Sequence, residues 1–132
     1  MIRVQEVVLP VLKAALPTVL VVSWVPDVDH RSFPMISIAR RGGVRNINLP
    51  SGYSLPVVEM AAVSADGLIE AEELYEGALD ALYASVSDQN VIPGVGYLQS
   101  LREEQGASQV PSVYSDSWAV QGSFRVGVRS LP

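Results

Sequence analysis

The stretch LPVVEMAAVSADGLIEAEELYEGALDALYASV, residues 55–86, holds one strand pattern followed by the clearest helix pattern in the chain. Val57 to Val63 predicts a strand. From Ser64 onward, apolar residues recur at the spacing of one helix face. That face comprises Ala71, Leu74, Tyr75, Ala78, Ala81, Leu82 and Val86. Ser64 or Asp66 is expected to cap the start of the helix.

Three further segments precede this unit. Val4 to Leu16 predicts an amphipathic helix, which Pro17 ends. Thr18 to Val25 is rich in β-branched residues and apolar on both faces, a pattern typical of a central strand. Phe33 to Arg41 predicts a second strand. The pair Gly42-Gly43 is expected to open a long loop that lasts until the next strand.

Two strands are predicted after the long helix, at Val95 to Arg102 and at Trp118 to Arg129. A loop is expected between them, from Glu103 to Asp116. The last strand alternates apolar and polar residues, as a strand with one buried face does. The order is therefore helix, three strands, helix, two strands. It predicts an α+β fold: a mainly antiparallel sheet with two helices packed on one side.

Length and composition limit the class of protein. The chain has 132 residues, which fits a single domain over residues 1–132. Apolar residues make up 48% of it and charged residues 17%, too apolar a composition for a disordered chain. This composition suggests that partners cover some of the surface. The net charge of −5 argues against general affinity for nucleic acid, and the lack of cysteine excludes thiolate chemistry.

The apolar stretch from Val7 to Val25 is nearly long enough to cross a bilayer. Lys13 near its centre and the helix-breaking Pro10 and Pro17 argue against a membrane span. We therefore expect a short helix, a proline break and a buried strand, with no membrane as partner.

The only histidine, His30, has Asp27 and Asp29 nearby in the sequence. A metal site or a general base is one interpretation of this loop. A solvated surface histidine is the other, and it is favoured because a metal site needs further ligands. No nucleophile lies at a spacing that indicates an activating base. We expect no catalytic residue, no metal site and no cofactor.

The densest positive cluster follows the second predicted strand, where Arg40, Arg41 and Arg45 surround Gly42-Gly43. Arginine matches phosphate oxygens, and it is also enriched where subunits meet. Solvated hairpin charges are a third interpretation. The long helix offers carboxylates that a second copy's arginines could contact. The hypothetical interface comprises Arg40, Arg41, Arg45, Glu72, Glu73 and Glu76.

The order of several segments resembles the tail terminator, or tail-completion, proteins of long-tailed bacteriophages. These segments are VVSWVP, FPMISIARRGG, LPVVEMAAV, EAEELYEGALDAL and DSWAVQGSFRVGVRSLP. The resemblance extends over most of the chain, roughly Val4 to Arg129. It implies a structural virion protein, not an enzyme, that caps the tail tube, ends its polymerisation and joins the tail to the head.

The resemblance also implies partners and a location. The partners are further copies in a homohexameric ring, the tail tube protein and a head-side connector or stopper protein, with DNA passing through the ring lumen. The location is the neck of the virion, after assembly in the host cytoplasm. The residues alone leave two alternatives open: a small nucleic-acid-binding module that uses Arg40, Arg41 and Arg45, and a small hydrolase or ligand-binding domain.

Overall fold

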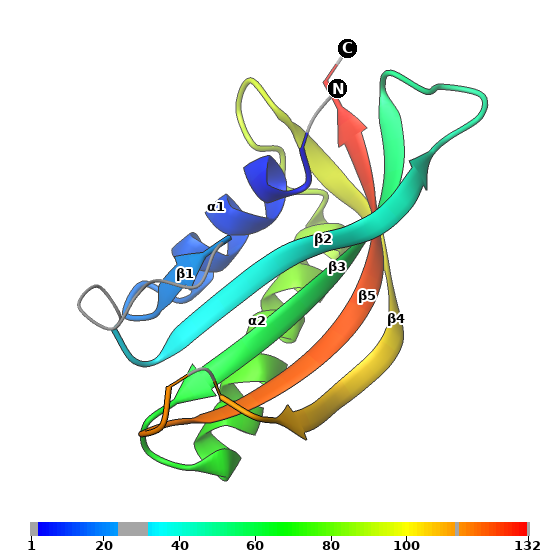
Figure 1. Ribbon diagram of the computed structural model, residues 1–132. Coiled ribbons are helices and arrows are strands. Elements are labelled where there is room, and N and C mark those ends of the chain that lie inside the picture. The colour runs from blue at the N-terminus through cyan, green and yellow to red at the C-terminus, as the bar shows by residue number, and fades with distance from the viewer. Residues whose placement is uncertain (1–2, 24–31, 113, 132) are drawn as a thin grey trace.

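The computed structural model describes residues 3–23, 32–112 and 114–131. Its elements follow the predicted order of one helix, three strands, one helix and two strands (Figure 1). They are α1 (Gln5–Ala15), β1 (Leu20–Val22), β2 (Met35–Arg45), β3 (Tyr53–Ser64), α2 (Leu68–Asp88), β4 (Gly96–Val110) and β5 (Trp118–Ser130).

The five strands form one sheet in the order β1-β2-β3-β5-β4. Only β1 runs parallel to its neighbour; the other three pairings are antiparallel. Both helices lie on one face of this sheet, and the described residues form no helix on the opposite face, which we call the helix-free face (Figure 1). The predicted α+β fold is confirmed. Neither helix, among the residues described, has both the length and the apolar character that crossing a bilayer requires.

The main core lies between the sheet and the helices. Alternate residues of β3 and β5 are buried, as their period of two predicts, and Met60 and Phe124 are fully enclosed. On α2 the buried side chains recur at helical spacing: Ala71, Tyr75, Ala78, Leu79, Leu82 and Ser85. Leu74, predicted on this face, packs against the core while partly exposed.

The prediction of a central strand at Thr18 to Val25 is wrong for its described part, Thr18 to Ser23; Trp24 and Val25 lie outside the described residues. β1 is a three-residue strand at one edge of the sheet. Its two faces are nevertheless both covered: Val21 joins the main core, whereas Val22 joins a second cluster with Met35 and Tyr114. An edge strand covered on both sides has the same apolar pattern as a central one, so the sequence pattern cannot distinguish them.

Two predicted loops are largely strand. β2 continues through Gly42-Gly43 to Arg45, and β3 begins at Tyr53. Likewise, β4 extends through most of the expected loop to Val110. Residues 102–109 are exposed, so this half of β4 has no buried face to impose an apolar alternation. The predicted helix cap is also wrong, because Gly67 holds the cap position and Ser64 Oγ instead accepts a hydrogen bond from the Asp66 amide.

Candidate functional site

The arginine cluster surrounds a bulge in β2. Arg40 is in register with Val58 of β3, but the next paired residue is Gly43, opposite Pro56. Gly43 has a φ of 103°, and a Cβ there would collide with the Leu55 carbonyl and Pro56. Only glycine fits this close approach between the two backbones.

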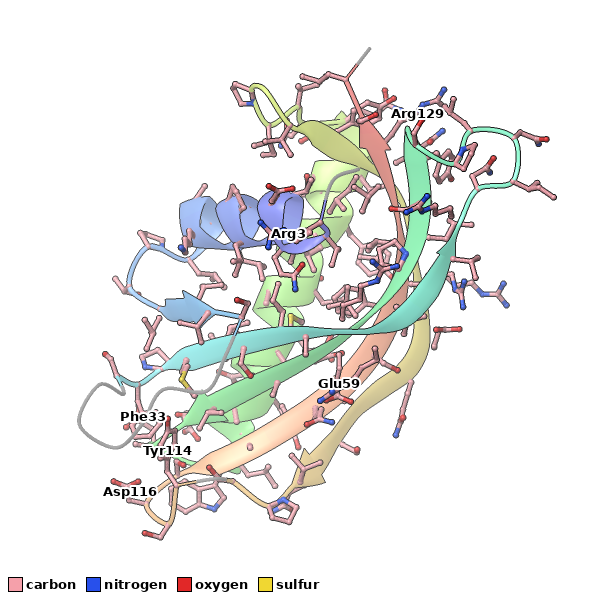
Figure 2. All side chains as sticks on the ribbon, turned by 45° about the horizontal axis from the view of Figure 1, so that its top comes forward. Arg3, Phe33, Glu59, Tyr114, Asp116 and Arg129 are labelled. Carbon is pink, nitrogen blue, oxygen red and sulfur yellow. The ribbon has the colours of Figure 1, made fainter. Side chains whose placement is uncertain are left out.

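Arg41 lies on the helix-free face and already has a partner. Its Nη2 and Nε donate hydrogen bonds to Glu59 Oε1 at 2.9 and 3.1 Å. Hydrogen bonding to Glu59 and the negative charge of Glu59 raise the pKa of Arg41. Figure 2 shows Glu59 near the middle of the sheet, with Arg129 toward the hairpin end and Tyr114 toward the other. The sequence pattern gave no indication that Glu59 would be this partner.

Arg40 and Arg45 have no carboxylate within ion-pair distance among the residues that the structure describes. Arg40 Nε donates to the carbonyl of Gly42 at 3.0 Å, and both side chains are exposed. Arg40 shares its register position with Val58, whose side chain is buried on the helix side. Since paired residues project from the same face, Arg40 points to the helix side and Arg41 away from it.

The turn between β2 and β3 carries exposed apolar side chains. Ile47 is 90% exposed, with Val44 and Leu49 also at the surface. Asn46 orders this turn, because its Oδ1 accepts hydrogen bonds from the amides of Asn48 and Leu49 at 2.9 and 3.2 Å. We call residues 44–49 the hairpin tip. The sequence contained a signal for it, since Val44, Ile47 and Leu49 interrupt a polar segment that was expected to be an ordinary loop.

The predicted acidic surface lies elsewhere on the molecule. Glu72, Glu73 and Glu76 are exposed on the first half of α2, and none forms an ion pair with a residue of the described ranges. β3 runs from the hairpin tip to the start of α2, so these glutamates and the tip lie at opposite ends of the sheet (Figure 1). The structure does not bring the two predicted charge groups together within one chain.

A second acidic group, Glu103 and Glu104, was expected in a loop and lies on β4. Glu103 Oε2 accepts a hydrogen bond from the Tyr83 hydroxyl at 2.7 Å, and this bond raises the pKa of Tyr83. Glu104 Oε2 lies 4.0 Å from Arg125 Nε on the neighbouring strand. Both glutamates are exposed on the outermost strand of the sheet.

The helix-free face contains a shallow cavity of about 230 Å³. Small side chains of three strands line part of it: Ser37 and Ala39 of β2, Ala61 of β3 and Ala119 of β5. Across the described ranges, no three histidine, aspartate or glutamate side chains form a cluster that could hold a metal ion. His30, Asp27 and Asp29 lie outside the described residues, so the alternatives for that loop stay predictions.

Known proteins are similar to this chain over nearly its whole length. A family model described as "Phage tail termination protein" matches residues 1–132. A "Gene 22 protein" of Mycobacterium phage D29 is 55% identical over 130 residues, which cover 97% of this chain and 93% of that protein. The "Gene 22 protein" of Mycobacterium phage L5 is 54% identical over 129 residues, 96% of this chain and 92% of that protein.

Among solved structures, a chain from "Virion of native gene transfer agent (GTA) particle" has the same fold, with a TM-score of 0.60. The match covers 96% of this chain and 95% of that one, at 15% identity.

Proposed function

The chain belongs to the phage tail termination protein family, and from this premise we propose that it caps the tail tube as a hexameric ring and ends tube growth. The family is one of structural phage proteins, and this chain is a structural tail component of the virion. In the proposed role, one side of the ring contacts the last tube ring. The other side presents a surface to the head-side connector or stopper protein, and DNA passes through the lumen.

The observation that carries the capping role is the hairpin tip. Ile47 is 90% exposed although Asn46 holds the turn in a defined conformation. An ordered apolar turn that extends beyond the sheet is suited to bind in an apolar depression on the surface of another protein. We propose that the hairpin tip docks on the tube or the connector, along the axis of the ring.

The charged groups supply the remaining contacts of the proposal. Arg40 precedes the tip and Arg45 lies within it, and neither has a carboxylate within ion-pair distance among the described residues. Arg41 could exchange Glu59 for a partner's carboxylate. The glutamates of α2 form a separate surface at the far end of the sheet, suited to a second partner. A ring hides a different patch on each side of every subunit, which accounts for the apolar composition of a small chain. Assembly in the host cytoplasm and residence at the virion neck follow from this role.

Tube polymerisation tests the proposal directly. Purified tube protein is polymerised with and without this chain, and tube lengths and tube ends are measured by electron microscopy. We expect added protein to shorten the length distribution and to leave a ring at one end of each tube. Tubes of unchanged length with bare ends would contradict the capping role.

The nucleic-acid alternative makes a different prediction. Binding through arginine–phosphate contacts weakens steeply as salt rises, so a gel shift lost between low and physiological salt favours it. The ion pair of Arg41 with Glu59 counts against it, since one of the three arginines is already neutralised.

A further inference from the structure

The sheet has two long edges that no described strand covers. β1 pairs with β2 only from Met35 to Ser37, so the outer edge of β2 is open along residues 38–45. β4 is the last strand at the opposite edge of the sheet, and no described strand pairs with its outer edge. Open edges present unpaired amides and carbonyls, and they are templates for pairing with another chain.

These two edges carry charged side chains of opposite sign. The open part of β2 contains Arg40, Arg41 and Arg45 and no acidic residue. The open part of β4 contains Glu103 and Glu104, beside a single Arg102. Pairing two β2 edges would place arginines together. Pairing a β2 edge with a β4 edge places arginine against glutamate, which stabilises a cross-strand contact.

The register places the opposite charges at the same level. Arg40 pairs with Val58, Val58 with Phe124, and Phe124 with Glu103. Arg40 and Glu103 therefore end the same row of residues across the sheet. Both project to the helix side, since Val58 and Phe124 are buried there and Glu103 contacts Tyr83 of α2.

Strand direction is also compatible. β2 and β3, β3 and β5, and β5 and β4 are each antiparallel, so β4 runs opposite to β2. In a ring whose axis follows the strands, every copy keeps the same direction. The β4 of one copy would therefore pair with the β2 of the next copy as an antiparallel neighbour. The helices of all copies would then lie on the same side of the continuous sheet.

We infer that copies of this chain join edge to edge, the outer edge of β4 pairing with the outer edge of β2 of the next copy, with Glu103 facing Arg40. The inference rests on the proposed ring and specifies its subunit contact. Such a joint is heterologous, so it either closes into a ring or continues as a filament.

The test is a pair of charge reversals, Arg40→Glu and Glu103→Arg, with the assembly measured by native mass spectrometry, alone and on tail tubes. Arg40→Glu makes the two facing residues negative, and Glu103→Arg makes both positive. We expect each variant alone to lose the ring. An equal mixture should restore it, because alternating copies meet with opposite charges at every joint and a hexamer has an even number of joints.

Controls separate this joint from other effects of charge. Lys13→Glu and Asp88→Arg make the same charge changes on exposed helix residues and should leave the ring intact. Because the chain lacks cysteine, Arg40→Cys with Glu103→Cys gives a second readout: oxidation should link copies into covalent oligomers.

Rings formed by both single charge variants, without cross-linking of the cysteine variant, would overturn the joint while the ring itself stands. Loss of the ring on Glu72→Arg but not on Glu103→Arg would instead identify the α2 glutamates as the subunit contact. A wild-type chain that stays monomeric both alone and on tubes contradicts the ring, and the edge joint fails with it.

Discussion

Gly122 of β5 lies in a place that no larger residue fits. A Cβ there would overlap the Tyr75 hydroxyl of α2 and lie 2.8 Å from the Gln105 carbonyl oxygen of β4. We predict that Gly122→Ala lowers the free energy of unfolding by about 1–3 kcal/mol, since the added carbon overpacks the contact of helix and sheet. Urea denaturation measures the change.

Gly77 provides the matched control, because a Cβ at this position of α2 meets no atom within 4 Å. Gly77→Ala should raise stability by about 0.5–1 kcal/mol through the higher helix propensity of alanine. If Gly122→Ala proves as stable as the wild type, the packing of α2 on β5 described here is incorrect.

Tyr75 makes stability depend on pH in the alkaline range. Burial, followed by the charge of Glu103, raises its pKa to about 12 from the ordinary value of 10. Above pH 10 the unfolded chain loses this proton while the folded chain keeps it, so stability decreases between pH 10 and about 12. Tyr75→Phe should show a shallower decrease in its urea midpoint over this range. Parallel curves for the two proteins would argue against the buried hydroxyl.

Single contacts of this kind were the least predictable part of the molecule. Arg41 and Glu59 are 18 residues apart, and they meet because Ala39, two residues before Arg41, pairs with Glu59, so both side chains project from the same face of the sheet. The sequence indicated that glycines follow the arginines. It could not indicate whether they end the strand or bend it.

At the level of single elements, α2 anchors the helix layer. Leu82 is fully buried, whereas Glu72 is exposed on the same helix. Leu82→Ala should cost about 2–5 kcal/mol through the cavity that it leaves. Glu72→Gln should change stability by less than about 0.5 kcal/mol. Thermal melts of the two variants check the assigned face, and the reverse order of effects would mean that it is inverted.

The hairpin tip should contribute to assembly and little to folding. Ile47 is 90% exposed, so Ile47→Asp removes almost no buried surface and should keep the wild-type melting transition. The same variant should fail to cap tail tubes, because a charge replaces the apolar contact. Electron microscopy of tube ends is the readout.

Ile69→Asp is the control for the hairpin tip, an equally drastic change at a side chain 65% exposed in the first turn of α2. It should cap normally. Capping by Ile47→Asp as well would contradict a tube contact of the hairpin tip and leave the connector as its proposed partner.

Elements with one buried face were predictable, and the others were not. β5 and α2 follow their periods closely because the core lies on one side of each. The exposed half of β4 has no buried side, so its polar residues resembled a loop although its backbone is paired with β5. β1 showed the opposite ambiguity, since two clusters cover its faces at the sheet edge.

On the scale of the whole molecule, order and fold class followed from the sequence because they depend on the succession of periods along the chain. The charged surfaces could not be predicted from the sequence, because they depend on which strands are outermost in the sheet. With β2 open at one edge and β4 at the other, the monomer presents arginines and glutamates on opposite ends of one sheet. In a ring whose copies are related by rotation about one axis, the arginine edge of each copy would meet the glutamate edge of the next.

The most direct test of the proposed ring is the mass of the assembly that this chain forms on tail tubes, released intact and measured by native mass spectrometry. The account predicts one species at six times the 14.2 kDa mass of the chain. A single mass at another multiple would correct the number of copies while keeping the ring. Release of single chains only, or a continuous series of masses from an open filament, would contradict a closed hexameric cap.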